Sequence, residues 1–325
     1  MNLPKLDNLD IAGKRVLLRL DLDCEPDIND LRIKSSFETL DYLKSHNTSE
    51  IIILGHRGRP TTFDESVSLK PFQPIFDKWG ARVEENLRFD PGEENNDPEF
   101  AKKLSSMGDM FVNEAFASSH REHASIVGLP KLLPSAVGFH FQKEIENLSK
   151  VLENPNHPVL FLLNGIKKDK LDYLEGIKKL ADRSRSDKIL IGGRLPEYLG
   201  DAALESVRLQ PESEQVIIGN LTMDKEDITL NTIDRFEKEI KKAQTIVVSG
   251  PVGKYEDEGH RQGTEKVFKA IIASSAYKVA GGGDTEKAIN MLAISDKFDW
   301  ISVGGGSMLE FLTKKTLPGL EALRS

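Results

Sequence analysis

Two stretches in the second half of the chain, "VAGGGDTEKA" (279–288) and "VGGGSMLEFL" (303–312), lead from an apolar run through three glycines into a helical pattern. One glycine with positive φ is enough for a tight turn, so three glycines favour the close approach of another group to the backbone. Free amides at a helix N-terminus bind anions, because the helix dipole adds to their positive ends. The shared pattern therefore predicts that helix amides bind phosphate groups here.

Asp284 follows the first glycine motif and would repel a phosphate unless a metal ion lay between them. Its position predicts a magnesium ligand, and a simple helix cap is the alternative. Close packing also uses glycine, and Ser307 after the second motif could be an N-cap only. Neither motif, nor a third in "ILIGGRLPEYL" (189–199), has the Walker A pattern or the Gly-x-Gly-x-x-Gly spacing of a dinucleotide fold. Two identical glycine turns with a third are nevertheless hard to explain by packing alone, so we interpret the motifs as a site where helix N-termini bind a nucleoside triphosphate.

Basic residues gather in three motifs of the first half, each placed after an apolar run: "GHRGRP" (55–60), "ENLRFDPGEE" (85–94) and "FASSHREHAS" (116–125). The planar fork of arginine matches the geometry of carboxylates and phosphates. One such motif could be a solvated loop, but three in an acidic chain favour a pocket for a small anion. The histidines could bind a metal ion, although the interleaved arginines and the lack of thiolates make that interpretation the weaker one.

Three lysines, Lys167, Lys168 and Lys170, follow another apolar run in "LNGIKKDKLDYL" (163–174). Charge runs are usually solvated faces. Their place at the end of a buried strand nevertheless fits a catalytic cation, because phosphoryl transfer depends on positioning and on neutralising the phosphoryl oxygens.

The elements that must position these residues follow from the alternation of short apolar runs and amphipathic stretches, which is typical of parallel sheets covered by helices. The alternation restarts near residue 158, after the helical pattern "FQKEIENLSKVLENP" (141–155). The predicted fold class is therefore α/β, with two doubly wound parallel-sheet (Rossmann-like) domains joined by a helical hinge. In such sheets ligands bind at the carboxyl ends of the strands, where these motifs lie.

Composition excludes several classes of protein. A formal net charge of −8 over 325 residues argues against a nucleic-acid-binding protein, which needs an excess of Lys and Arg on one face. No run reaches the roughly twenty apolar residues that span a bilayer, so we expect no membrane association. Cys24 is the only cysteine, which excludes an intramolecular disulfide and a thiolate zinc site and favours a reducing, cytoplasmic location.

The ordered motifs resemble the phosphoglycerate kinase family over nearly the whole chain. They are "GKRVLLRLDLD", "GHRGRP", "ENLRFDPGEE", "VNEAFASSHREHAS", "SGPVGKYE", "GGGDT", "VGGGSMLEFL" and the final "LPGLEAL". The resemblance implies a 3-phosphoglycerate-binding domain over residues 1–153, onto which residues 315–325 pack back, and a reduced nucleotide-binding domain over residues 154–314. It further implies a monomer whose co-substrates are ATP and ADP and whose cofactor is Mg²⁺.

The implied reaction is the reversible transfer of a phosphoryl group between 1,3-bisphosphoglycerate and MgADP, directly and in line after domain closure. Matched by motif, Arg32 is expected at the reacting carboxyl, Lys167 at the transferring phosphoryl group, and the amides of Gly283 and Gly306 at the transition state. The residues expected to bind the phosphoglycerate are Asp21, Asp23, Arg32, His56, Arg59, Arg88 and Arg121. Those expected to bind the nucleotide, with Glu256 at the ribose and Asp284 also at Mg²⁺, are Lys167, Lys170, Gly192, Gly193, Gly250, Glu256, Gly281, Gly282, Gly283, Asp284 and Thr285.

The chain departs from the family pattern at several points. Asp23 adds a carboxylate near an anionic substrate, which would weaken binding unless Asp23 turns toward an arginine. Lys167 and Lys170 stand three residues apart rather than four, but on a helix we expect them to share one face. A short acidic segment, "PESEQVIIGNLTMDKEDITL" (211–230), replaces a longer region, and Arg194 and Pro196 alter the adenine wall. We expect a smaller nucleotide domain with a more open base pocket.

Two other functions are compatible with these departures: a nucleotide- or phosphate-binding homologue without catalysis, and a kinase that acts on a different acyl phosphate. Retention of both lysines, Arg32, Asp284 and both glycine motifs favours the phosphoglycerate kinase, because a binding protein has no need of groups directed at a transition state.

Overall fold

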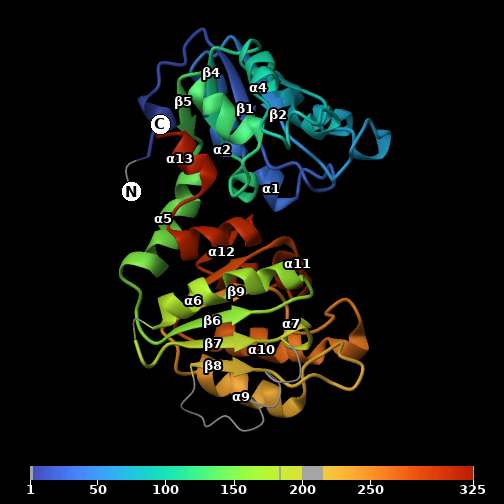
Figure 1. Ribbon diagram of the computed structural model, residues 1–325, viewed down its shortest axis with the longest axis vertical. Helices are drawn as coiled ribbons and strands as arrows, with labels where there is room; N and C mark the ends of the chain where they lie inside the picture. Colours follow the sequence, from blue (N-terminus) through green and yellow to red (C-terminus); the bar gives the residue numbers. More distant parts are fainter. Residues whose placement is uncertain (1–2, 183, 200–214, 325) are drawn as a thin grey trace. The chain divides into compact units, whose positions relative to one another are not determined.

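The computed structural model describes residues 3–182, 184–199 and 215–324 of the chain. The chain divides into two compact units, of which the first comprises Met1–Glu146 with Thr316–Ser325 and the second Asn147–Lys315. Each unit has one parallel β-sheet with helices packed on it, so the predicted α/β fold class is confirmed (Figure 1). No helix in the described ranges is long and apolar enough to cross a membrane.

The sheet of the first unit has the strand order β3-β2-β1-β4-β5, and the pairs are parallel. Its strands are β1 (Arg15–Arg19), β2 (Glu50–Leu54), β3 (Ala81–Val83), β4 (Met110–Asn113) and β5 (Ser135–Val137). The helices of this unit are α1 (Leu31–Lys34), α2 (Phe37–Ser45), α3 (Gln73–Phe76), α4 (Pro98–Ser105) and α13 (Pro318–Ala322).

Successive residues of the first sheet face opposite sides, and both sides are buried. Leu18 joins the core beneath α2, whereas its neighbour Leu17 joins the core beneath α4. A sheet that is covered on both faces requires strands that are apolar throughout, which explains runs such as "RVLLR" and "EIIIL". Polar side chains of these strands therefore lie at the strand ends, except in the edge strand β3, whose middle residue Arg82 is exposed.

The sheet of the second unit has the order β11-β10-β9-β6-β7-β8, again with parallel pairs. Its strands are β6 (Val159–Leu163), β7 (Lys188–Ile191), β8 (Val216–Ile218), β9 (Thr245–Ser249), β10 (Tyr277–Gly281) and β11 (Trp300–Ser302). The helices are α6 (Leu174–Ala181), α7 (Leu195–Tyr198), α9 (Leu230–Ile240), α10 (Gln262–Ala273), α11 (Gly283–Met291) and α12 (Gly305–Lys314).

The acidic segment 211–230 contributes to this second unit. Residues 211–214 lie outside the described residues, and the rest forms β8, a turn closed by a bridge between Leu221 and Ile228, and the start of α9. Ile228 belongs to the core in which Phe236 of α9 and Phe268 of α10 pack on the sheet. The segment is therefore part of the folded unit.

The predicted hinge helix is α5 (Phe139–Glu153), and it contains the boundary between the two units. It ends just before Asn154, as the sequence predicts, but begins two residues earlier than the pattern at 141. Glu114, which follows β4, accepts hydrogen bonds from the amides of His140 (3.0 Å) and Phe141 (2.9 Å). A carboxylate distant in the sequence therefore caps the helix.

The C-terminal segment belongs to the first unit. Helix α13 packs on the short helix Ala124–Gly128, and the Gly319 amide donates to the Ser119 carbonyl at 3.0 Å. A side chain at Gly319 would lie 3.0 Å from Ile126, so the close approach favours glycine there.

We predict that Phe236→Ala lowers the free energy of unfolding by about 3–5 kcal/mol, because it removes a fully buried ring from the core of the second unit. Leu230→Ala on the same helix is the matched control: Leu230 is 57% exposed, and we expect a change within about 0.5 kcal/mol. Urea unfolding followed by circular dichroism measures both. Equal effects would contradict this assignment of the core.

Candidate active site

The predicted anion-binding residues of the first unit lie at the carboxyl edge of its sheet. Asp21 follows β1, His56 and Arg59 follow β2, Arg88 lies in the short helix Leu87–Phe89 after β3, and Arg121 follows β4. Because these strands are neighbours and parallel, the structure brings the four loops together at one edge.

Arg19, the last residue of β1, organises this edge, although the sequence analysis did not select it. Its side chain is fully buried, and its guanidinium donates to Ser125 Oγ at 2.9 Å and to His56 Nδ1 at 2.7 Å. Glu93 is equally buried, and its Oε1 atom lies 4.0 Å from Arg19 Nη2. The Glu93 carboxylate also accepts hydrogen bonds from the Ser125 amide (2.9 Å) and hydroxyl (2.6 Å). The only sequence signal was a charge at the end of an otherwise apolar strand.

His56 and His123 are neutral members of this basic edge. Burial, and then the charges of Arg19, Arg88 and Arg121, hold the pKa of His56 well below its ordinary value. The same causes lower the pKa of His123 to about 3. Within the described part of the chain, no three His, Cys, Asp or Glu side chains form a group that could bind a metal ion. The positive charge of the edge therefore comes from its arginines.

Arg88 and Arg121 present two of these charges. Arg88 is buried, donates to the Gly58 carbonyl at 2.5 Å and pairs with Glu94 at 2.8 Å. Burial, and then the charge of Arg121, lower the pKa of Arg88, while the charges of Glu94 and Asp23 act in the opposite direction. Such an arrangement favours an anionic ligand.

Asp21 and Asp23 are both engaged within the unit. Asp21 accepts hydrogen bonds from the Ala117 amide and the Ser118 hydroxyl, both at 2.6 Å, and so holds the loop that leads to Arg121. Asp23 accepts from the Gly58 amide at 2.8 Å, and its charge acts on Arg88.

Arg32, on α1, donates to the backbone carbonyl of Asp23. Arg32 therefore holds the backbone of Asp23, whereas the carboxylate of Asp23 faces the "GHRGRP" loop, where it accepts from the Gly58 amide.

The two lysines of the second unit do not share a helical face, so that expectation was wrong. Lys167 has an extended backbone, and the short helix begins after it at Lys168–Tyr173. Lys170 donates to the carbonyls of Asn164 (2.7 Å) and Ser249 (3.0 Å), and burial lowers its pKa to about 8. The side chain of Lys167 is exposed and makes no hydrogen bond or ion pair with any residue that the structure describes. Lys170 is therefore fixed, whereas Lys167 is available to a ligand.

The two triple-glycine turns pack against each other. Gly282 has a φ of 102°, and a side chain at Gly305 would lie 2.9 Å from the Gly282 Cα atom. Some of the glycines are therefore needed for packing as well as for any ligand.

Helices α11 and α12 begin at Gly283 and Gly305, with Gly282 and Gly304 as their N-caps. The amides of Gly283 and Gly306 lie in the first turns, where helices leave amides without intrahelical partners. Ser307 is buried two residues inside α12, so its interpretation as the N-cap was wrong.

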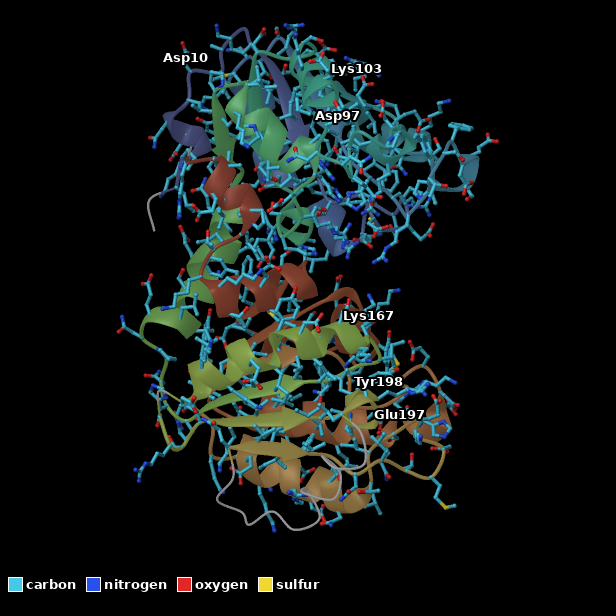
Figure 2. All side chains as sticks on the ribbon, in the orientation of Figure 1. Asp10, Asp97, Lys103, Lys167, Glu197 and Tyr198 are labelled. Carbon is cyan, nitrogen blue, oxygen red and sulfur yellow. The ribbon has the colours of Figure 1, made fainter. Side chains whose placement is uncertain are left out.

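A cavity of about 560 Å³ lies beside these turns at the carboxyl edge of the second sheet. Three of the predicted nucleotide-binding residues, Gly193, Glu256 and Asp284, line it. Figure 2 labels Lys167 and Tyr198 at the edge toward which β6 and β7 point. The lining residues are Gly165, Ile166, Gly193, Arg194, Tyr198, Glu226, Pro251, Gly253, Lys254, Tyr255, Glu256 and Asp284.

Other predicted nucleotide-binding residues surround this cavity without lining it. The Gly250 amide donates to the Thr285 hydroxyl at 2.8 Å, and that hydroxyl donates to the Gly281 carbonyl at 2.8 Å. A side chain at Gly192 would lie 2.7 Å from Asn164 Oδ1. These groups hold the strand ends together, and their assignment as nucleotide ligands stays a prediction.

Arg194 and Pro196, which the sequence predicts to alter the adenine wall, lie in different surroundings. Arg194 lines the cavity and pairs with Glu197 at 2.9 Å, whereas Pro196 is buried at the start of α7.

Asp284 offers the donor set that a nucleotide-bound magnesium ion requires. Its side chain lines the cavity, and its carboxylate makes no hydrogen bond or ion pair with the described residues. Mg²⁺ is commonly held by one or two carboxylates together with phosphate oxygens and water, so a single free carboxylate fits. Asp284 is the second residue of α11 and caps no amide there.

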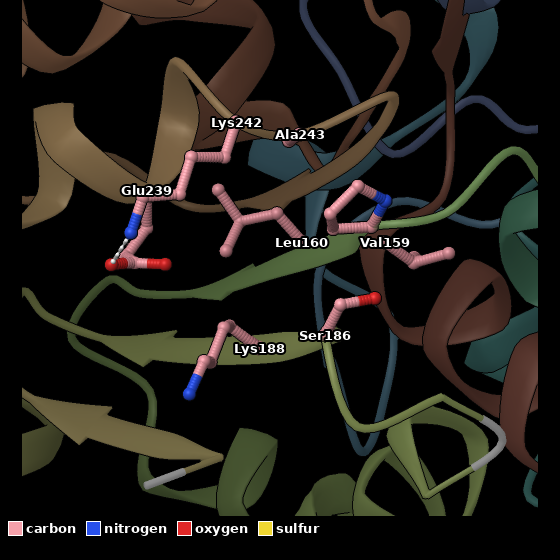
Figure 3. A pocket seen from close by; sticks show the side chains of 8 residues that line it. Val159, Leu160, Ser186, Lys188, Glu239, Lys242 and Ala243 are labelled. Atoms are coloured by element: carbon pink, nitrogen blue, oxygen red, sulfur yellow. Dashed lines mark hydrogen bonds and ion pairs between the residues drawn. The ribbon is translucent and has the colours of Figure 1, made fainter. Parts of the chain in front are cut away.

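A second cavity, of about 180 Å³, lies at the opposite edge of the same sheet, where β6 and β7 begin (Figure 3). None of the predicted site residues lines it. Lys242 at its rim is paired with Glu239 at 2.8 Å. The lining residues are Pro158, Val159, Leu160, Ser186, Lys188, Glu239, Lys242 and Ala243.

Comparison with known proteins supports the resemblance seen in the sequence. A model of the family described as "Phosphoglycerate kinase" matches residues 6–84, 80–204 and 201–315. The phosphoglycerate kinase of Finegoldia magna is 34% identical over 398 aligned positions, which cover 99% of each chain. That of Dictyoglomus turgidum is 33% identical and covers 97% of this chain and 96% of its own. The alignments are longer than this chain, so parts of these relatives have no counterpart here.

Solved structures give the same result. Phosphoglycerate kinase from Coxiella burnetii matches 99% of both chains with a TM-score of 0.79 and 28% identity. The enzyme from Pyrococcus horikoshii OT3 matches 98% of both chains with a TM-score of 0.80 and 27% identity. Sequence and fold agree over almost the full length, and with the arginine-rich and glycine-rich edges described above they show that the chain belongs to the phosphoglycerate kinase family.

Proposed function

We propose that the protein transfers a phosphoryl group reversibly between 1,3-bisphosphoglycerate and MgADP, giving 3-phosphoglycerate and MgATP. The observation that carries this proposal is the cavity at the glycine-rich edge of the second sheet, where the unpaired carboxylate of Asp284 and the side chain of Glu256 line one space. Family membership supplies the reaction, and the residues below are proposed to perform it. No observation favours a non-catalytic homologue or another acyl phosphate.

The first unit is proposed to bind the phosphoglycerate through its basic edge. Arg59, Arg88 and Arg121 supply positive charge to the phosphate and carboxylate oxygens, and the neutral His56, whose Nδ1 accepts from Arg19, can donate a hydrogen bond through Nε2. The charge on Asp23 is directed to the Gly58 amide and to Arg88. We therefore expect Asp23 to orient the "GHRGRP" loop rather than to repel the substrate.

The second unit is proposed to bind the nucleotide in the 560 Å³ cavity, with Glu256 at the ribose and the first-turn amides of α11 and α12 at the phosphates. Asp284 would hold Mg²⁺, which when bound neutralises charge on the phosphate oxygens. Lys170 is held by two carbonyls, so it contributes a fixed positive field beside Asp284.

The transferring group needs charge stabilisation that is not already used within the protein. Lys167 meets this requirement because it is exposed and unpaired within the described part of the chain. We propose that Lys167 and Arg32 contact the phosphoryl group as it passes between the carboxyl and the nucleotide, with the amides of Gly283 and Gly306. Because the acid and the nucleotide are assigned to different units, transfer is proposed to follow closure of the units around both ligands.

Further expectations concern the state of the protein. The family binds small-molecule substrates and nucleotides, and we propose no nucleic-acid or membrane partner. A monomeric state and a cytoplasmic location stay predictions.

The first test of this function is the coupled assay of Lys167→Ala. With 3-phosphoglycerate and MgATP, coupled to glyceraldehyde-3-phosphate dehydrogenase and NADH, we expect rapid NADH loss in the wild type. In the variant we expect kcat to fall by about 10²–10³, because a charge directed at the transition state is removed. Lys168→Ala, which removes an adjacent exposed lysine, is the control and should retain most activity. A folded wild type without turnover would contradict the proposed function, and equal activity of both variants would contradict the role of Lys167.

A second test concerns the buried network beneath the basic edge. Ser125→Ala removes the hydroxyl between Arg19 and Glu93, and we expect it to leave their buried charges short of one partner. Such a loss costs about 1–3 kcal/mol, so we expect a lower melting temperature and roughly a tenfold rise in the KM for 3-phosphoglycerate, with the KM for MgATP unchanged.

Ser105→Ala, at the partly exposed last residue of α4, removes a hydroxyl that donates to the Lys102 carbonyl of the same helix and is the control for the serine substitution. A loss of stability without any change in the KM for 3-phosphoglycerate would show that the network serves only the fold.

A further inference from the structure

Two loops of the second unit form one wall of the nucleotide cavity. Glu226 comes from the loop between β8 and α9, and Lys254, Tyr255 and Glu256 come from the loop between β9 and α10. The backbone joins the loops once nearby, where the Lys254 amide donates to the Glu226 carbonyl at 2.8 Å. The shape of this wall therefore depends on how firmly the two loops are held together.

The side chains of Lys254 and Glu226 also form an ion pair across the loops at 3.8 Å. His260 makes a further connection, through the turns that flank these two residues. Its Nε2 atom lies 2.9 Å from Asp224 Oδ2 in the first loop, and its Nδ1 atom lies 2.9 Å from Asp257 Oδ2 in its own loop. The imidazole is 26% exposed, so it can exchange a proton with solvent.

Each carboxylate also holds the turn to which it belongs. Asp224 Oδ1 accepts hydrogen bonds from the Thr222 hydroxyl (2.6 Å) and the Glu226 amide (3.2 Å). Asp257 Oδ1 accepts from the Gly259 amide at 3.0 Å. One oxygen of each carboxylate thus fixes its own loop, and the other faces His260. The position of Glu226 is linked to the imidazole through Asp224.

Both contacts can be hydrogen bonds only when the imidazole carries two protons. A neutral imidazole has one N–H group, and its other nitrogen bears a lone pair that would face a carboxylate oxygen. The protonated ring donates to both carboxylates. The two flanking aspartates raise the pKa of His260 above its ordinary value, and hydrogen bonds lower the pKa of Asp224 to about 2.

Two other charged groups act in the same region. Asp227 lies close enough to His260 for their charges to interact, but its carboxylate is occupied by the amides of Ile228 and Gly263, each at 2.8 Å. The charge of Lys254 acts on Asp257. Neither replaces the contacts that the imidazole makes with Asp224 and Asp257.

We propose that His260 is a positioning residue for the nucleotide: when doubly protonated, it fastens the loop of Asp224 to the loop of Asp257 and holds Glu226 and Glu256 at the cavity wall. This inference rests on the proposed function, in which this cavity binds the nucleotide. The ligand of the cavity is a nucleoside di- or triphosphate. His260, Asp224 and Asp257 do not line the cavity, so their connection acts on the ligand only through the residues that do.

The direction of the pH effect follows from the raised pKa. The connection is complete below the ordinary histidine pKa of about 6.5 and is lost as the pH rises through the higher value in the folded protein. Nucleotide affinity should therefore be greatest at the acidic end of this range and decrease toward alkaline pH. High salt should weaken the connection, because its groups are partly exposed.

The test compares the wild type with His260→Gln, which can donate hydrogen bonds but cannot carry the charge. Titration calorimetry gives the Kd for MgADP at several pH values from about 6 to 9. The phosphates and Lys170 also titrate in this range, but they do so in both proteins, so the informative quantity is the ratio of the two Kd values. We expect the variant to bind about threefold more weakly at pH 6 and equally at pH 9, since partly exposed ion pairs have modest energies.

Asp224→Asn provides a second variant that removes the charge from the other loop. We expect the same pH-dependent ratio, while the KM for 3-phosphoglycerate stays unchanged. His46→Gln, at an exposed histidine of the first unit, is the matched control and should give a ratio of one throughout. Circular dichroism melting of each variant confirms that the proteins compared are folded.

The outcomes separate this inference from the proposed function. A wild type that turns over and binds MgADP, with variant ratios of one at pH 6 or ratios independent of pH, would overturn the role of His260 alone. A folded wild type that neither binds MgADP nor turns over would overturn the proposed function, and this inference with it.

Discussion

Burial of both faces of each sheet is the constraint on which the rest of the structure depends. Strands such as β1 and β6 are apolar almost throughout because helices cover them from two sides. Polar groups are then left to the strand ends and the loops that follow them. Since the strands of each sheet are parallel, their carboxyl ends form one edge, and a ligand site at that edge follows from the architecture.

The two edges offer different groups to the anions that they are proposed to bind. The first uses side-chain charge, and it buries the guanidinium of Arg19 beside Glu93, Ser125 and His56. A buried charge is tolerated only with a partner and hydrogen bonds, and Glu93, Ser125 and His56 supply these to Arg19. Neutral histidines allow the arginines to lie close together with no further repulsion. A local positive field therefore exists in a chain whose net charge is negative.

The second edge uses the backbone, and its glycines have two separate purposes. Gly282 and Gly305 let two turns pack closely, and Gly250 is tied to Thr285. The first-turn amides of α11 and α12, together with the carboxylate of Asp284, are the groups left for a ligand. Lys167 and Lys170 divide in the same manner, since carbonyls hold Lys170 whereas Lys167 faces solvent. Two residues of the same type in one motif can therefore differ, because one is held by contacts within the protein and the other is free to contact a ligand.

The sequence by itself determined the α/β class, the hinge helix and the motifs that gather at the two edges, because apolar periodicity and strand ends are local properties. It did not reveal Arg19 and Glu93, which are 74 residues apart by number, or that His260 faces Asp224 from 36 residues away. It also suggested a helix through Lys167 and an N-cap at Ser307, both of which are wrong. Only the tertiary structure decided these points. Hydrogen bonds and ion pairs between distant segments depend on which strands are neighbours, and no local pattern carries that information.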